Sequence, residues 1–211
     1  MHRKEIITRG KKPEEAVAVL ILIHGRGGSA DDILSLAPYF PLHDFALLAP
    51  QATNHSWYPY SFMAPAASNE PWLTSALSLL NELVLELESK RISRENIYFL
   101  GFSQGACLTL EFVTRHAAKY GGVIAFTGGL IGEKINLQNY GGNFSGTPIF
   151  IGSSDPDPHV PVERVNETSA ILEKMGARVS RKIYKGMGHT ISQEEIHEAK
   201  SLIFSGRNNL S

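Results

Sequence analysis

The sequence predicts an α/β protein with a mostly parallel central sheet and helices on both faces. Two observations favour this class. Apolar runs alternate with helical patterns along the chain. Most of those runs are continuously apolar, as central strands covered on both faces are. The chain has 211 residues and is 43% hydrophobic, so we expect one domain over residues 1–211 with a sizeable core.

The expected strands are short and separated by turn residues. The run 16–23 is apolar throughout, which is typical of a central strand. The segment 179–184 alternates and carries charge, so we expect it nearer an edge of the sheet, and 6–9 is expected to form a short extra strand. The other expected strands are 45–49, 97–102, 122–126 and 148–152.

Helical patterns lie between these strands. Gly176 follows one helix as a plausible C-cap, and Ser192 with Glu195 forms a capping box at the start of the last. The segments 49–69 and 128–146 are expected to be loops, and nothing in the sequence predicts a large lid. The expected helices are 31–39, 70–90, 106–118, 162–175 and 192–204.

Composition argues against several classes of function. The net charge is −1 and no basic stretch is interleaved with aromatic residues, so we expect no nucleic-acid partner. The longest apolar run, 16–23, is too short for stable membrane insertion. The single Cys107 fits a reducing compartment, and we expect a cytoplasmic protein with that residue in its core. No metal-ligand spacing occurs, so neither metal nor cofactor is expected.

The pattern G-x-S-x-G spans residues 101–105, where an expected strand runs into an expected helix. Glycines on both sides of Ser103 allow a sharp, strained turn that exposes the hydroxyl. The helix that follows directs its N-terminal amides at the position where an anion would form. This context predicts a nucleophilic serine.

A serine hydroxyl needs a base, and the base needs an acid to orient it. His189 follows the last expected strand and precedes the last helix, so it is the predicted base. The strand 148–152 leads into two candidate acids. Counting from the strand end favours Asp155, whereas counting back from 160–161 favours Asp157, and we favour Asp157.

The loop after the first core strand is the predicted source of one oxyanion donor. The Arg26 amide and the amide of Gln104, directly after the nucleophile, are the expected pair. We expect the Arg26 side chain to be solvated and His24 to shape the loop. The same loop fits G-x-G-x-x-A, a dinucleotide-binding pattern, but the acid that should end the next strand is missing.

Taken together, these motifs resemble the phospholipase/carboxylesterase family of α/β-hydrolases, which includes acyl-protein thioesterases and small bacterial carboxylesterases. The matching stretches span nearly the whole chain. One departure is that the stretch between Gly152 and Val160 is longer than the usual family spacing. A dienelactone-hydrolase-like enzyme is a neighbouring possibility, although that group usually has cysteine in place of Ser103. The matching stretches are 22–25, 101–105, 127–130, 157–161 and 188–189.

The resemblance implies an α/β-hydrolase fold and a serine hydrolase that cleaves small-molecule carboxylic esters or thioesters. It implies Ser103, Asp157 and His189 as the triad of an acyl-enzyme mechanism. A catalytically silent member of the fold, used for binding or sensing, is the alternative. The oligomeric state is left open. The expected substrate pocket is lined by Trp57, Tyr58, Phe62, Met63 and Leu130.

Overall fold

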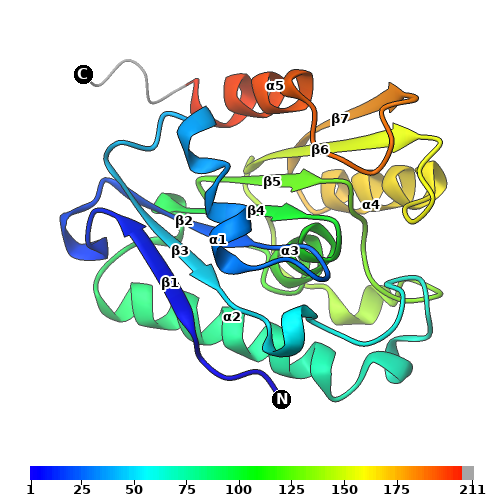
Figure 1. Ribbon diagram of the computed structural model, residues 1–211, viewed down its shortest axis with the longest axis horizontal. Coiled ribbons are helices and arrows are strands. Elements are labelled where there is room, and N and C mark those ends of the chain that lie inside the picture. The colour runs from blue at the N-terminus through cyan, green and yellow to red at the C-terminus, as the bar shows by residue number, and fades with distance from the viewer. Residues whose placement is uncertain (206–211) are drawn as a thin grey trace.

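The computed structural model describes residues 1–205, which contain a seven-stranded sheet in the order β1-β3-β2-β4-β5-β6-β7 (Figure 1). Strand β1 pairs antiparallel with β3 at one edge, and the pairs from β3 to β7 are parallel. The strands are β1 (Ile6–Gly10), β2 (Ala18–Ile23), β3 (Phe45–Pro50), β4 (Ile97–Phe102), β5 (Gly122–Phe126), β6 (Pro148–Asp155) and β7 (Arg178–Lys185).

Helices cover both faces of this sheet, and each face has its own apolar cluster. Helices α1 and α5 pack on one face, and α2, α3 and α4 pack on the other. None of the helices in the described residues combines the length and apolar composition needed to cross a membrane. The helices are α1 (Ala30–Leu34), α2 (Trp72–Ser89), α3 (Gln104–Arg115), α4 (Val162–Lys174) and α5 (Gln193–Phe204).

The parallel strands all end at one side of the sheet, so the loops that follow them meet there (Figure 1). Strand β4 is central and leads directly into α3. Two glycines let α3 approach the sheet. A Cβ on Gly101 would lie 2.5 Å from the Gly105 carbonyl oxygen, and one on Gly105 would lie 2.1 Å from the Ile23 carbonyl oxygen. Larger residues would push α3 away from the strands.

Most expected elements occur, with shifted ends. The edge position predicted for β7, the short extra strand predicted at 6–9 and the capping box of α5 are confirmed. The prediction of one continuous helix over 31–39 is wrong. Helix α1 stops at Leu34, and a 3₁₀ turn follows over Ala37–Tyr39. Pro38 explains the break, because inside a continuous helix its ring would clash with the Leu34 carbonyl.

Strand β6 runs three residues beyond its expected end at Gly152. Ser153 and Ser154 look like loop residues in the sequence, yet both are buried. Their backbone pairs with β7 as far as Asp155 opposite Lys185. The extra pairing carries β6 to the edge where the candidate catalytic residues lie.

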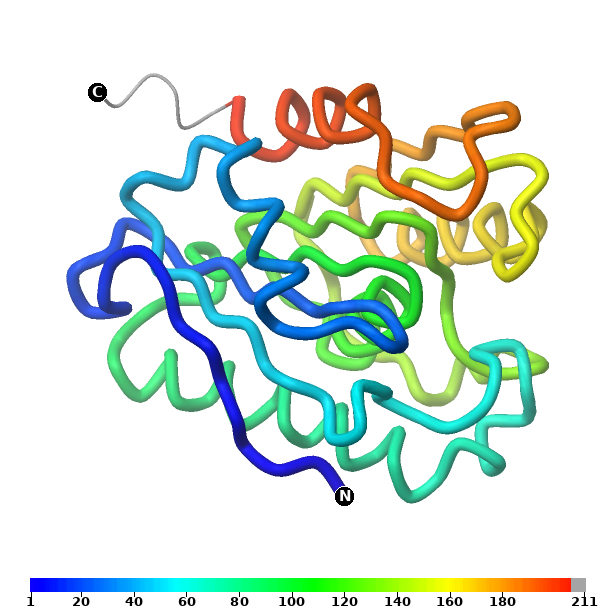
Figure 2. Tube along the Cα trace, in the orientation of Figure 1, coloured from blue at the N-terminus to red at the C-terminus, as the bar shows by residue number. Residues whose placement is uncertain are grey.

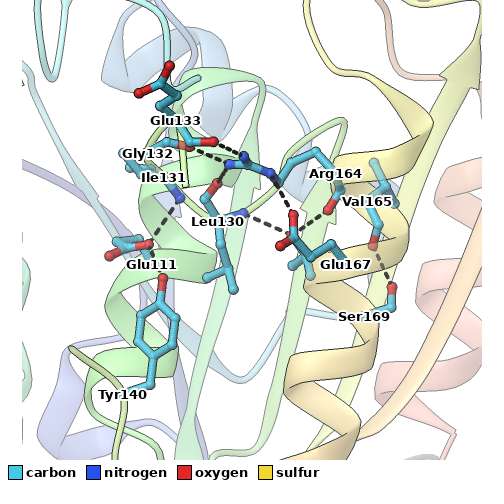
Figure 3. A network of polar contacts seen from close by, with 11 residues as sticks. Glu111, Leu130, Ile131, Gly132, Glu133, Tyr140, Arg164, Val165, Glu167 and Ser169 are labelled. Carbon is cyan, nitrogen blue, oxygen red and sulfur yellow. Dashed lines mark hydrogen bonds and ion pairs between the residues drawn. The ribbon is translucent and has the colours of Figure 1, made fainter. Parts of the chain in front are cut away.

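The two long loops expected from the sequence lie against one another beyond the strand ends (Figure 2). The Gly132 amide donates to the Phe62 carbonyl at 2.7 Å. Arg164 donates to the carbonyl oxygens of Leu130 and Gly132 at 2.8 and 2.7 Å, and Glu111 accepts from the Ile131 amide at 3.1 Å (Figure 3). Two helices therefore fix the loop that supports Phe62.

Candidate active site

Ser103 occupies the turn between β4 and α3 with φ 53° and ψ −118°. Positive φ is strained for a residue with a side chain and persists only where the surrounding structure imposes it. Here the Ser103 amide donates to the Phe126 carbonyl at 2.9 Å, and its carbonyl accepts from the Cys107 amide at 3.0 Å. The backbone is thereby fixed, and the hydroxyl stands at the N-terminus of α3.

Three side chains far apart in the sequence meet at this turn. Ser103 Oγ lies 2.7 Å from His189 Nε2, and His189 Nδ1 lies 2.9 Å from Asp157 Oδ2. An ionised carboxylate only accepts hydrogen bonds, so Nδ1 carries the ring proton. Nε2 is then free to accept the serine proton. This is the arrangement that general-base activation of a hydroxyl requires.

Asp157 is held in its ionised form. Burial opposes its charge, but the amides of His159 and Val160 donate to Oδ1 at 2.8 and 2.9 Å, and His189 donates to Oδ2. These bonds outweigh burial and hold the pKa of Asp157 below its ordinary value. Asp155 instead ends strand β6 and is exposed.

The loop carrying His189 is fastened to the end of β6. The Gly188 amide donates to Ser154 Oγ at 2.9 Å, and the Gly186 amide donates to the Asp155 carbonyl at 2.9 Å. The imidazole packs between Phe102 and His159, with ring centroids 5.5 and 4.8 Å away. The extended end of β6 therefore positions both the acid and the base.

The peptide between Gly25 and Arg26 has a fixed orientation. Its carbonyl accepts from His24 Nδ1 at 2.7 Å and from the Gly28 amide at 3.2 Å. Because a trans peptide directs its N–H opposite to its C=O, the Arg26 amide points away from His24. That amide has no acceptor among the residues that the structure describes.

His24 itself is buried and neutral at pH 7. Its Nε2 accepts from the Ala52 amide at 3.1 Å, and burial lowers its pKa. The sequence led us to expect that His24 shapes this loop. It does so by fixing the orientation of the peptide between Gly25 and Arg26.

The Arg26 side chain is exposed, but it also forms hydrogen bonds within the protein, which corrects the expectation that it is simply solvated. Its guanidinium donates to Ser56 Oγ, the Pro59 carbonyl and the Tyr60 carbonyl at 2.9, 2.9 and 2.7 Å. The Gln104 side chain accepts from the Trp57 amide at 2.9 Å and donates to the Tyr58 carbonyl at 2.8 Å. Both side chains thus bind one segment, residues 56–60.

A cavity of about 600 Å³ opens onto Ser103. Tyr58 and Phe62 border it, as expected, together with Cys107. Residues that the sequence did not single out for this role also contribute, including His159 and Val160, which the resemblance placed only near the acid. The sequence signal that could have found them is their place directly after the acid.

Three expected pocket residues do not border this cavity, namely Trp57, Met63 and Leu130. Trp57 is fully buried and donates its indole N–H to the His24 carbonyl at 2.8 Å. Leu130 is also fully buried, with its carbonyl bound by Arg164. Met63 packs against the main core cluster. Their roles are in packing the loops.

Cys107 lies in the core, as expected, one helical turn beyond Ser103. Burial raises the pKa of its thiol to about 12. The thiol therefore stays protonated at neutral pH and is unsuited to act as a nucleophile.

Comparisons with known proteins agree with this architecture. The sequence model of the phospholipase/carboxylesterase family matches residues 2–205. The crystal structure of a phospholipase/carboxylesterase from Dyadobacter fermentans is similar with a TM-score of 0.95 and 55% sequence identity. The similarity covers 96% of this chain and 97% of that one.

Curated relatives match over shorter segments. Acyl-protein thioesterase 1 of Kluyveromyces lactis is 34% identical over 129 residues, which are 60% of this chain and 57% of the relative. The match thus spans little more than half of that relative's length. The carboxylesterase of Bacillus cereus has a TM-score of 0.78 at 22% identity over 96% of this chain and 94% of that chain, a likeness in fold alone.

Proposed function

Since the chain belongs to the phospholipase/carboxylesterase family and has the α/β-hydrolase fold, we propose that it is a serine hydrolase of carboxylic esters or thioesters. The observation that carries this proposal is the 2.7 Å contact between Ser103 Oγ and His189 Nε2, with Asp157 on the other ring nitrogen. The names of the relatives support the same reaction class.

In the first half of the proposed reaction, Ser103 Oγ attacks the acyl carbonyl carbon while its proton passes to His189 Nε2. Asp157 holds the imidazole in the useful tautomer and stabilises the imidazolium. The carbonyl oxygen becomes an oxyanion and accepts hydrogen bonds from the Arg26 and Gln104 amides. Collapse of this intermediate expels the alcohol or thiol, which takes the proton from Nε2, and leaves an acyl-enzyme.

In the second half, water attacks the acyl-enzyme and gives its proton to His189. A second oxyanion forms in the same place and collapses to release the carboxylic acid and restore the serine proton. The support for Gln104 as a donor is its position as the first residue of α3, where its amide has no intrahelical acceptor. The support for Arg26 is the fixed peptide described above.

The test is hydrolysis of 4-nitrophenyl butanoate by the wild-type protein and by Ser103→Ala. We expect turnover by the wild type and a loss of at least about 10⁴-fold in the variant. The circular dichroism spectrum and melting temperature of the variant control for folding. Wild-type turnover that persists in Ser103→Ala would refute the assignment.

We further propose that the chain forms one domain and acts in the cytoplasm. A single sheet with helices on both faces supports the first statement. A single buried cysteine, which has no partner for a disulfide in the sequence, supports the second.

A further inference from the structure

Arg26 places a positive charge at the wall of the cavity that opens onto Ser103. Its side chain is exposed, and the acceptors of its guanidinium are all neutral: Ser56 Oγ and the carbonyl oxygens of Pro59 and Tyr60. Arg26 forms no ion pair within the part of the chain that the structure describes. The arginines that do form ion pairs there are Arg9, Arg94, Arg115 and Arg164.

The guanidinium also has N–H groups left to donate. It carries five in total. Nη1 donates to two acceptors and Nη2 to one, so the N–H of Nε and one N–H of Nη2 have no acceptor among the described residues. A carboxylate has two oxygen atoms and accepts two parallel hydrogen bonds from such a group. Arg26 therefore has both the charge and the donors to bind one.

The cavity wall has no acidic residue that would compete for Arg26. The charged and titratable nitrogen groups that line it are those of Arg26, His159 and His189, and none of the described residues lining it is aspartate or glutamate. The Asp157 side chain is fully buried behind His189, and Asp32 accepts from an amide and a hydroxyl at the start of α1 instead. Since the whole chain carries a net charge of only −1, the positive character is local to the cavity.

The guanidinium is held in place before any substrate binds. Its bonds to the carbonyl oxygens of Pro59 and Tyr60 fix it, and its Cζ atom lies 5.9 Å from the centre of the Tyr58 ring. A group anchored in this way loses little conformational freedom when a ligand binds. Holding two carbonyl oxygens requires donors but no net charge, so the charge is available for a second role.

We propose that Arg26 recognises a carboxylate group on the ester or thioester substrate, so that the preferred substrate is an anion. This inference rests on the proposed function, because the carboxylate belongs to the molecule whose acyl group Ser103 accepts. The Arg26 amide and side chain then have separate tasks: the amide binds the oxyanion, and the guanidinium selects the substrate. The carboxylate lies either on the acyl chain or on the leaving alcohol, and the two arms of the test distinguish these positions.

The first arm uses acyl chains that end in a carboxylate. The substrates are the 4-nitrophenyl half-esters of adipic, pimelic and suberic acid, each matched with the ester in which a carboxamide replaces the free carboxylate. The carboxamide keeps the size and planarity of the group but removes its charge. Shorter diacids are avoided because their carboxylates attack their own ester group.

The second arm places the carboxylate on the leaving group. It compares 3-carboxyphenyl butanoate with 3-carbamoylphenyl butanoate, again a charged group against a neutral one of similar shape. In both arms the carboxylate preference is the kcat/KM of the charged ester divided by that of its neutral partner. Loss of anchoring by residues 56–60 lowers both values alike and cancels in this quotient, whereas loss of charge recognition does not.

The variants are Arg26→Gln, which removes the charge, and Arg26→Lys, which keeps it. We expect the carboxylate preference to fall by about tenfold or more in Arg26→Gln, in at least one arm, and to stay within about threefold of the wild type in Arg26→Lys. Arg181→Gln is the matched control, because it removes one exposed positive charge from β7, away from the cavity. Its carboxylate preference should equal that of the wild type.

An unchanged carboxylate preference in Arg26→Gln, in both arms, would overturn the proposal, as would an equal fall in Arg181→Gln. A wild type that hydrolyses the neutral esters but none of the charged ones would overturn it as well. Failure of the proposed function is a separate result, in which the wild type hydrolyses no ester of either kind.

A binding measurement keeps the two failures apart. Ser103→Ala and the double variant Ser103→Ala/Arg26→Gln are titrated with the adipic half-ester and its carboxamide, and chemical shift changes in NMR spectra report binding. We expect the Arg26→Gln change to weaken binding of the half-ester by about tenfold and to leave the carboxamide unaffected. Equal binding of the half-ester by both proteins would contradict the role of Arg26 whether or not the wild type turns over.

Discussion

Arg26 and Gln104 hydrogen-bond to the same hydroxyl group, Ser56 Oγ, at 2.9 and 3.4 Å. The amides of these two residues are the proposed oxyanion donors, while their side chains hold residues 56–60. Three residues of that segment, Tyr58, Pro59 and Tyr60, border the cavity. The residues whose amides are the proposed oxyanion donors are therefore tied to the wall of the cavity.

Replacement of Arg26 by lysine tests this connection. Lysine keeps the charge but lacks the planar guanidinium group that donates to three acceptors. Residues 56–60 therefore lose part of the hydrogen bonding that holds them in place. We expect kcat to fall by about tenfold, with a smaller change in KM, since the amide shifts while the cavity remains. Steady-state kinetics on 4-nitrophenyl butanoate measure both constants. Arg181→Lys, on an exposed arginine of β7, is the control and should leave both unchanged.

His24 gives a second prediction, because it orients the peptide of one proposed oxyanion donor, Arg26. His24→Ala removes the donor to the Gly25 carbonyl and frees that peptide to rotate. We expect kcat to fall by about 10²-fold, comparable with loss of one oxyanion donor. Asparagine places an N–H near the position of Nδ1, so His24→Asn should retain much more activity than the alanine variant. Equal losses in the two folded variants would argue that the hydrogen bond to Gly25 is unimportant.

The acid is tested by paired amide substitutions. Asp157→Asn keeps the shape of the side chain but no longer fixes a proton on His189 Nδ1, so we expect kcat to fall by about 10²–10⁴-fold. Asp155→Asn changes an exposed side chain at the end of β6 and should retain activity within about threefold of the wild type. Kinetics on the same ester decide between them. A large loss only in the Asp155 variant would mean that the wrong carboxylate is assigned.

Glu195 makes stability depend on pH. Its side chain is buried, Oε2 accepts from the Ser192 amide at 3.0 Å, and Oε1 has no partner in the described part of the chain. Burial raises its pKa from 4.5 to about 7, partly opposed by the Ser192 bond. The folded state thus keeps a proton that the unfolded state releases between these values. Stability should fall as pH rises through this window, by up to about 3 kcal/mol.

Glu195→Gln removes the titration while keeping an acceptor for the capping box. Urea unfolding at pH 5 and pH 8 should show the variant close to wild type at pH 5 and more stable at pH 8. Glu194→Gln, on an exposed neighbour in the same helical turn, is the control and should show no such difference. A stability difference between Glu195→Gln and wild type that does not change with pH would rule out this titration.

Much of the architecture could be predicted because its signals are local. Continuous apolar runs mark the central strands, and a glycine pair around Ser103 marks the strand-to-helix turn. The end of β6 could not be predicted from Ser153 and Ser154, because their burial depends on pairing with β7, thirty residues later. The break after α1 could have been predicted, since Pro38 lies inside the expected helix.

The site residues likewise divide into those that local sequence patterns indicate and those that depend on contacts between distant segments. His189 and Ser103 have clear positions relative to strands, whereas the pocket residues depend on how two loops fold against each other. Trp57 and Leu130 look like cavity residues in the sequence but point into the packing between loops and helices. The hydrogen bonds from the Arg26 side chain to residues 56–60 join segments about thirty residues apart. No local pattern in the sequence indicates them.

Covalent labelling with a fluorophosphonate tests the central assignment most directly. The reagent reacts with a serine that a neighbouring base has activated, and the modified peptide is identified by mass spectrometry. We expect one adduct on Ser103 of the folded wild type, none on Ser103→Ala, and labelling at least about 10²-fold slower in His189→Ala. Folded wild type that remains unlabelled, or that carries its adduct on another residue, would contradict the account.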